Sequence, residues 1–202
     1  FIDSMVYYYG GGEEFPKALF SYRNDTLDGV VEKYYENGEL KMKGVNKDDW
    51  RDGVEIHYYP NGDTSYVYQY KKGELHGSFI SYYQSGQVHQ TGKYSNDQTD
   101  SLWTTYYTDG TVSYQVSYKD DELHGPYIYS EYGSTTPTYE HEYYEGDIHS
   151  YKHYMDDGSL INQSERPSSG DFNFESFYSN GLLRTIGTFD KDGNRIGNWK
   201  YY

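Results

Sequence analysis

The sequence predicts an all-β fold, an elongated antiparallel meander of repeated β-hairpins with a period of 24 residues. Pairs of tyrosines recur at this interval, at Tyr34-Tyr35, Tyr58-Tyr59, Tyr82-Tyr83 and Tyr106-Tyr107. A glycine stands three residues after each pair, at Gly38, Gly62, Gly86 and Gly110. Apolar and polar residues alternate in the segment after a glycine, which is typical of a strand with one covered face. The recurrence means that one small unit is copied along the chain.

Each copy contains two strand-like segments joined by turns. The segment before the glycine is rich in β-branched and aromatic residues, as in Val54–Tyr59, Ser78–Tyr83 and Leu102–Tyr107. A short polar residue precedes each glycine, and Pro60 has the fixed φ of a type I turn. We therefore expect hairpins in which the glycine adopts a left-handed conformation, and we expect no helix.

The phase of the repeat suggests a single repeat-array domain, residues 1–202. Within it we expect a degenerate N-terminal unit over 1–26, regular repeats over 27–125, divergent units with loops over 126–170, and C-terminal units over 171–202. Two segments interrupt the rhythm and are read as loops: Gly133–Pro137 and Gln163–Gly170. One hairpin is marginal in water, so neighbouring units must stabilise one another.

Residue parity suggests which side of the strands is covered. We expect the more apolar column to form the core; it contains Val30, Val54, Ile56, Ile80 and Leu102, with Tyr34, Tyr58, Tyr82 and Tyr106. The opposite column is mixed in polarity, and we expect it to meet a partner. Its aromatic members are the candidate binding residues Tyr35, Tyr59, Tyr83, Tyr107, Phe79 and Trp103.

Composition excludes several classes of function. The formal net charge of −15 argues against nucleic acid, because phosphate binding needs clustered Lys and Arg. The absence of cysteine excludes disulfides, Cys-ligated zinc and thiol catalysis. No segment is apolar enough to be a transmembrane helix. The chain begins with Phe1, which we interpret as a processed product, favouring export or the cell envelope over the cytoplasm.

The repeat resembles the MORN repeat variant, as found in proteins labelled antitoxin components of the YwqK type. The likeness lies in Tyr70–Gly77 and Tyr118–Gly125, joined to the Tyr-Tyr-Pro-Asn-Gly run at Tyr58–Gly62. It covers most of the chain, and residues 126–146 are the poorest match. The resemblance implies hairpin arrays that act as interaction surfaces.

A second resemblance, to the aromatic repeats of choline- and glucan-binding modules on bacterial surfaces, suggests a different ligand. In those modules a cation or a sugar ring packs against aromatic faces. The chain has only three tryptophans, Trp50, Trp103 and Trp199, where those modules are tryptophan-rich.

One histidine-rich segment offers the best alternative to a pure scaffold. His141, His149 and His153 lie near Asp147 and Asp156, so a metal site and a hydrolase are conceivable there. The simpler interpretation is that these histidines are polar residues on an exposed strand. No catalytic motif accompanies the cluster. We therefore expect no enzyme activity, no cofactor and no metal. The main hypothesis is a scaffold for a basic protein partner, with carbohydrate or cell-envelope binding as the alternative.

Overall fold

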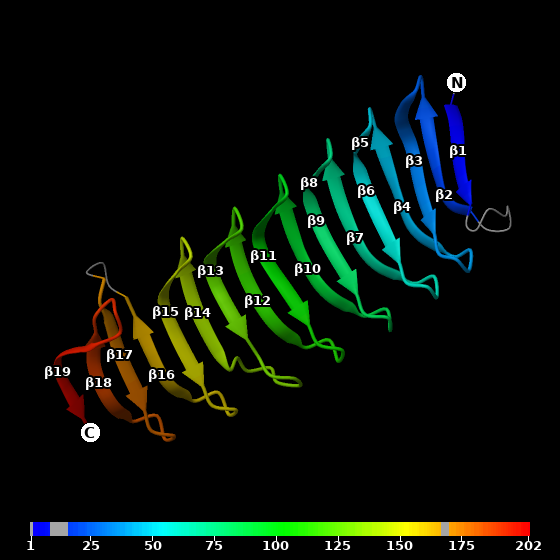
Figure 1. Cartoon of the computed structure of the whole chain (residues 1–202). Coiled ribbons are helices and arrows are strands. Elements are labelled where there is room, and N and C mark those ends of the chain that lie inside the picture. The colour runs from blue at the N-terminus through cyan, green and yellow to red at the C-terminus, as the bar shows by residue number, and fades with distance from the viewer. Residues whose placement is uncertain (1, 9–15, 167–169) are drawn as a thin grey trace. The chain divides into compact units, whose positions relative to one another are not determined.

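The computed structural model describes residues 2–8, 16–166 and 170–202 of the 202-residue chain. Within those ranges all regular structure is β-strand, as predicted (Figure 1). The described residues form no helix of the length and hydrophobicity that crossing a membrane requires. Consecutive strands pair antiparallel as hairpins, which confirms the predicted meander.

The contacts of the chain group into two units, Phe1–Asp100 and Ser101–Tyr202, and each unit is described by itself. The boundary lies within strand β11. The prediction of one continuous repeat-array domain therefore remains a prediction.

The described residues of the first unit form ten strands in sequence order. They are β1 Ile2–Tyr8, β2 Pro16–Arg23, β3 Thr26–Tyr34, β4 Leu40–Lys47, β5 Trp50–Arg51, β6 Gly53–Tyr58, β7 Thr64–Lys71, β8 Glu74–Leu75, β9 Gly77–Tyr82 and β10 Val88–Ser95. Short β5 and β8 each continue into the next strand after one irregular residue, and the two pieces pair with the same neighbour. One unit of the repeat is therefore a hairpin with an interruption near its start.

In the second unit, the residues that the structure describes form nine strands in the same arrangement. They are β11 Gln98–Tyr106, β12 Val112–Lys119, β13 Glu122–Tyr129, β14 Tyr139–Tyr144, β15 Asp147–Tyr154, β16 Leu160–Glu165, β17 Phe172–Phe177, β18 Leu183–Phe189 and β19 Arg195–Tyr201. The segment Gly133–Pro137 lies in the loop between β13 and β14, as predicted. The second predicted loop began too early, because Gln163, Ser164 and Glu165 belong to β16 and pair with β17. Residues 167–169 of that loop lie outside the described residues.

The glycine turns have the predicted geometry. In the turn after β6, the amide of Gly62 donates to the carbonyl of Tyr59 at 2.9 Å, and the amide of Tyr59 donates to the carbonyl of Asp63 at 2.7 Å. Gly62 has a φ of 89°, which a residue with a Cβ rarely adopts. Gly38, Gly86 and Gly110 have φ values of 85° or 86° in equivalent turns. The Gly that follows each tyrosine pair is thus fixed by backbone conformation.

Two-residue turns close the other ends of the hairpins. Asp48 and Asp49 have φ values of 50° and 69°, and Asp120 and Asp121 have 52° and 67°. Positive φ at both central residues defines the tight hairpin turn whose twist suits paired strands, and Asn and Asp tolerate it best after Gly. In the first unit the amide of Asp49 also donates to the carbonyl of Leu27 at 3.0 Å, linking one turn to the preceding hairpin.

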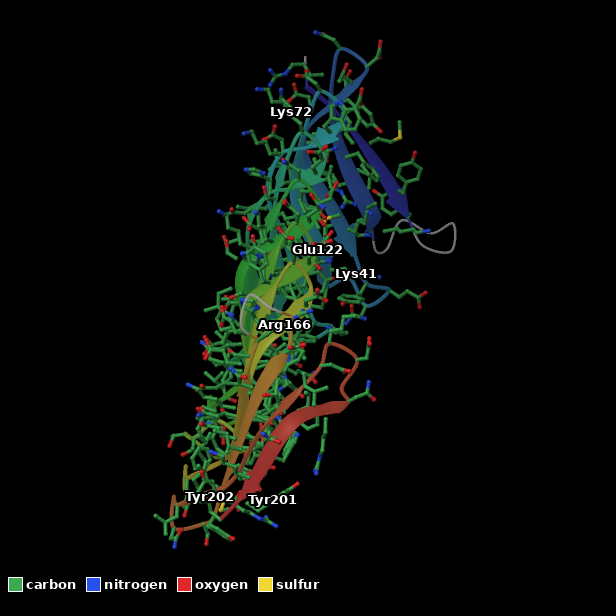
Figure 2. All side chains as sticks on the ribbon, turned by 90° about the vertical axis from the view of Figure 1, so that its left-hand side faces the viewer. Lys41, Lys72, Glu122, Arg166, Tyr201 and Tyr202 are labelled. Atoms are coloured by element: carbon green, nitrogen blue, oxygen red, sulfur yellow. The ribbon has the colours of Figure 1, made fainter. Side chains whose placement is uncertain are left out.

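The face predicted to be the core is the more exposed one, so that prediction was wrong. Val54 and Leu102 are each 45 % exposed. Their chain neighbours Glu55 and Trp103, on the other side of the strands, are 6 % and 7 % exposed. Within each unit the strands form a single layer with side chains on both sides (Figure 2), so burial comes from side chains covering one another. Large rings do this better than branched aliphatic chains, which is why the mixed column is the covered one.

Candidate interaction surface

One side of the sheet in the first unit carries a continuous group of aromatic side chains. Residues directly opposite one another on antiparallel strands project to the same side. Glu55 is opposite Tyr68, His57 is opposite Tyr66, and Gly53 is opposite Tyr70. With Phe79 and Tyr94 these residues form what we call the aromatic face of the first unit.

The rings of this face pack against one another edge to face or tilted. The centroids of Tyr66 and Tyr68 are 5.2 Å apart, those of Tyr68 and Phe79 are 4.9 Å apart, and those of Phe79 and Tyr94 are 6.1 Å apart. Each such pair contributes roughly 0.5–1.5 kcal/mol beyond area burial. Burial raises the pKa of the Tyr66, Tyr68 and Tyr70 hydroxyls, so they are neutral hydrogen-bonding groups at neutral pH.

A carboxylate lies beneath these rings. Glu55 Oε1 is 2.7 Å from His57 Nε2, and its Oε2 is 3.4 Å from Nε of Arg51. Burial alone would raise the pKa of Glu55, but the hydrogen bond from His57 and the Arg51 charge outweigh it and hold the pKa below 4.5. Because the folded pKa is depressed, the carboxylate stabilises the fold above its unfolded pKa, and that contribution is lost as pH falls through the folded value.

The second unit carries an equivalent aromatic face with a different composition. Strand pairing places Tyr127 opposite His141, His141 opposite Tyr151, and Tyr139 opposite both Tyr129 and His153. The Tyr127 and Tyr139 rings are 6.0 Å apart and nearly parallel, at 12°. Burial, together with neighbouring tyrosines, raises the pKa of Tyr139 to about 12. The aromatic face of the second unit consists of Trp103, Tyr114, Tyr127, Tyr129, Tyr139, His141, Tyr143, Tyr151 and His153.

The second tyrosine of each pair joins one hairpin to the next. The hydroxyl of Tyr35 donates to the carbonyl of Tyr58 at 2.7 Å, and that of Tyr59 donates to the carbonyl of Tyr82 at 2.6 Å. In the second unit the hydroxyl of Tyr107 donates to the carbonyl of Ser130 at 3.1 Å. These candidate binding residues therefore have a structural contact at the hydroxyl, while their rings stay half-buried. Tyr83, in the equivalent position, has its ring 4.6 Å from that of His89.

The two remaining candidate residues lie deeper. Phe79 is 8 % exposed and belongs to the aromatic face of the first unit, and Trp103 is 7 % exposed and belongs to that of the second. The six candidates are therefore not gathered in one place. Four of them stand at the glycine-turn ends of hairpins. The other two are buried, one in the aromatic face of each unit.

Several half-buried aromatic residues of the two faces were not among the candidates. Tyr66, Tyr68 and Tyr70 stand at every second position of β7, and Tyr139, His141 and Tyr143 do so on β14. Alternate residues of a strand point to one side, so aromatic residues at a period of two signal an aromatic face. That signal was present in the sequence and was hidden by the more obvious tyrosine pairs.

The histidine-rich segment is only partly brought together. The Nε2 atoms of His141 and His153 are 3.3 Å apart. His149 is exposed, and its ring is 6.3 Å from that of Tyr144. No group of three or more His, Cys, Asp or Glu within the described ranges is arranged to hold a metal ion.

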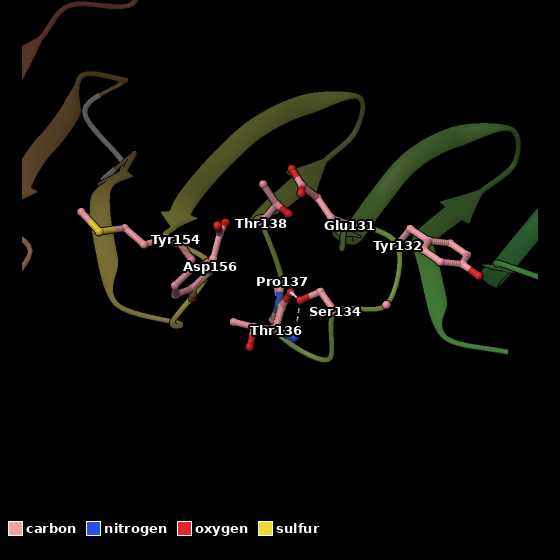
Figure 3. Close-up of a pocket in the computed structure, with 10 residues that line it drawn as sticks. Glu131, Tyr132, Ser134, Thr136, Pro137, Thr138, Tyr154 and Asp156 are labelled. Carbon is pink, nitrogen blue, oxygen red and sulfur yellow. Dashed lines mark hydrogen bonds between the residues drawn. The ribbon is translucent and has the colours of Figure 1, made fainter. Parts of the chain in front are cut away.

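A cavity of about 230 Å³ lies in the second unit beside the irregular loop between β13 and β14 (Figure 3). It is lined by Glu131, Tyr132, Ser134, Thr136, Tyr154 and Asp156, among others. Ser134 stabilises the loop, since its hydroxyl donates to the carbonyl of Thr136 at 2.9 Å and accepts from the Thr136 amide at 3.1 Å.

Four stretches of the chain match the family model described as MORN repeat variant, residues 27–45, 51–72, 75–96 and 100–120. These stretches are similar to the MORN repeat variant. No curated protein matches the chain. MORN repeats are in general non-catalytic modules that mediate protein or membrane interactions.

The MORN-variant matches coincide with single hairpins. The second match, 51–72, contains β6 and β7, and the third, 75–96, contains β9 and β10. The last match ends at residue 120, before the irregular loop that separates β13 from β14. The family model thus matches within the stretch expected to hold regular repeats, 27–125, and the proposed division of the chain into regular and divergent units stays a prediction.

Proposed function

We propose that the chain is a non-catalytic scaffold that binds a basic segment of a protein partner on its aromatic faces. The general role of MORN repeats supports an interaction function. The net charge of −15 favours a basic partner, because complementary charge speeds encounter and suppresses wrong partners. Half-buried tyrosines supply contact area at a low cost in side-chain entropy.

The observation that carries this proposal is the way the chain's own cations use these rings. The Arg51 guanidinium lies 5.0 Å from the centroid of the Tyr70 ring, and its Nη1 donates to the Tyr70 hydroxyl at 2.8 Å. Outside the residues that define the second aromatic face, but in the same unit, Arg195 makes the same kind of contact and lies 4.4 Å from the Trp199 ring centroid. A guanidinium or ammonium over an aromatic ring gains roughly 0.5–2 kcal/mol, more where water is excluded. An Arg or Lys side chain of a partner would find the same chemistry on other rings of the aromatic faces.

The candidate residues from the sequence have defined roles in this proposal. Tyr66 and Tyr68 form the centre of the contact surface in the first unit, and the rings of Tyr35, Tyr59 and Tyr83 form its margin. Tyr107 is the marginal residue in the second unit. Phe79 and Trp103 lie below the surface and hold the exposed rings in position.

The test compares the aromatic face with the opposite face of the same strands. The probe is a synthetic arginine-rich peptide of about ten residues, and binding is measured by calorimetry at two salt concentrations. The double variant Tyr66→Ala/Tyr68→Ala should weaken binding by at least about tenfold. The matched control Val54→Ala/Ile56→Ala changes the opposite side of β6 and should alter it by less than about twofold.

Neither double variant changes the net charge, which separates the proposal from non-specific attraction. If the peptide binds the tyrosine variant as tightly as the wild type, charge alone drives binding and the aromatic face has no role. Circular dichroism on both variants checks that the fold is retained.

The narrower hypotheses are distinguished by further probes in the same assay. A soluble glucan oligosaccharide that binds and competes with the peptide would favour the carbohydrate or cell-envelope alternative. The antitoxin-like role requires a basic toxin as partner, so it predicts that a co-expressed toxin is neutralised by the wild type and not by the tyrosine variant.

A further inference from the structure

Two imidazoles converge on the aromatic face of the second unit. His141 is on β14 and His153 is on β15, and they occupy adjacent positions in the register, since His141 is opposite Tyr151 and Tyr139 is opposite His153. Their Nε2 atoms are 3.3 Å apart. Both side chains are half-buried, so the pair is reached from one side only.

This separation fits a shared metal ion. Nitrogen ligands bind Zn²⁺ at about 2.0–2.1 Å in tetrahedral geometry, which places two ligand atoms about 3.3–3.4 Å apart. We propose that His141 and His153 form a two-imidazole site for a borderline divalent cation, of which Zn²⁺ is the representative. Imidazole nitrogen suits Zn²⁺, Cu²⁺ and Ni²⁺ and disfavours Mg²⁺ and Ca²⁺, which prefer oxygen ligands.

The surrounding rings hold the two imidazoles in this arrangement. Tyr139 stacks on His141 with centroids 4.9 Å apart at 25°, and Tyr151 packs on His153 at 5.1 Å and 31°. The Tyr127 ring also stacks on His141, with the two ring centroids 6.1 Å apart. Ligands fixed on paired strands lose little entropy on binding, which favours a site built from few residues.

Water or an external ligand would complete the coordination, because no third His, Cys, Asp or Glu of the described chain joins the pair. We therefore expect modest affinity and an exchangeable ion.

His149 supplies a matched control. It lies on the same strand as His153, but it is exposed and stands beside Tyr144 instead of the pair. The experiment titrates zinc chloride into tag-free protein near neutral pH and measures binding by calorimetry. We expect one ion per chain, with His141→Ala and His153→Ala each weakening binding by at least about tenfold and His149→Ala by less than about twofold.

A second measurement keeps the test independent of variant stability. Imidazole nitrogen resonances of the wild-type chain should shift with zinc at His141 and His153 and stay unchanged at His57 and His149. The proposal is overturned if zinc shows no saturable binding by about 1 mM, if the three alanine variants bind alike, or if other histidines shift instead. In those cases the 3.3 Å contact is a hydrogen bond between two neutral imidazoles. Neither measurement needs a protein partner, so its outcome is separate from that of the proposed scaffold function.

Discussion

Equivalent hairpins of the two units carry different side chains at the same position of the repeat. Glu55 in the first unit and Trp103 in the second stand two repeats apart in the sequence, and they are 6 % and 7 % exposed. A carboxylate and an indole differ in charge, volume and shape, yet both occupy a buried position of the strand. The frame of the hairpin therefore does not depend on a particular side chain at its centre.

What the two units share is main-chain chemistry. Glycine turns with positive φ close the hairpins in both units, and tyrosine hydroxyls bond to main-chain carbonyls of the next hairpin in both. Small residues then make room for large ones. Gly44 faces Glu55 in the first unit, and Gly187 lies under the Trp199 ring in the second. The frame fixes positions for rings, and the rings at those positions can differ between units.

The largest expected effect comes from filling the space at Gly187. A Cβ there would be 2.3–2.6 Å from ring atoms of Trp199, whereas a Cβ at Gly44 would be 3.3 Å from Cγ of Glu55. Neither glycine has a positive φ, so both substitutions test space alone. We expect Gly187→Ala to lower the free energy of unfolding by about 2–3 kcal/mol and Gly44→Ala by less than about 1 kcal/mol.

Urea unfolding followed by tryptophan fluorescence measures the two losses. Hydrogen exchange should localise the effect of Gly187→Ala to strands β17, β18 and β19, since Trp199 also packs on Phe174 and Phe189. Equal losses for the two variants would mean that the second unit tolerates crowding as well as the first, and the comparison would fail.

A smaller effect is expected from removing one tyrosine hydroxyl in each unit. Tyr59 in the first unit is half-buried and donates to Tyr82 O at 2.6 Å, whereas Tyr178 in the second is 43 % exposed and donates to Tyr202 O at 2.7 Å. A net hydrogen bond is worth about 0.5–1.5 kcal/mol, and less where water can replace it. Tyr59→Phe should therefore cost about 1 kcal/mol and Tyr178→Phe less than half of that.

Thermal unfolding of the two phenylalanine variants measures this difference. Phenylalanine retains the ring, so lost packing does not contribute. A larger loss for Tyr178→Phe than for Tyr59→Phe would show that exposure is a poor guide to the strength of these contacts.

The fold was predictable from the sequence because its signals are local. Gly62 after Asn61 and the alternation after it identify a turn and a strand without any tertiary information. The covered face was not predictable in the same way. Side-chain polarity alone predicts that aliphatic Val54 is buried and that Glu55 is exposed. In a single-layer sheet, however, Glu55 is buried on the side of the sheet that Tyr68 shares, where it also forms ion pairs. The pairing of His141 with His153 depends on the register of β14 and β15, which the sequence spacing does not specify.

The smallest expected effect concerns Ser101, which occupies a position of the repeat that is glycine in neighbouring copies. Gly29, Gly53, Gly77 and Gly125 recur with the period of the repeat and have φ values of 101–131°, and Ser101 stands between the last two in the same phase with a φ of 61°. A left-handed conformation costs an ordinary residue about 1–2 kcal/mol, partly offset by the greater entropy that glycine loses on folding. Ser101→Gly should therefore stabilise the second unit by about 0.5 kcal/mol.

The reverse change in the same unit, Gly125→Ser, should destabilise it by about 1–2 kcal/mol, because a Cβ there would also lie 3.2 Å from that of Ser117. Thermal unfolding of the two variants measures both shifts; if Ser101→Gly instead lowers the melting temperature, the serine side chain makes a contact worth more than the backbone strain it carries.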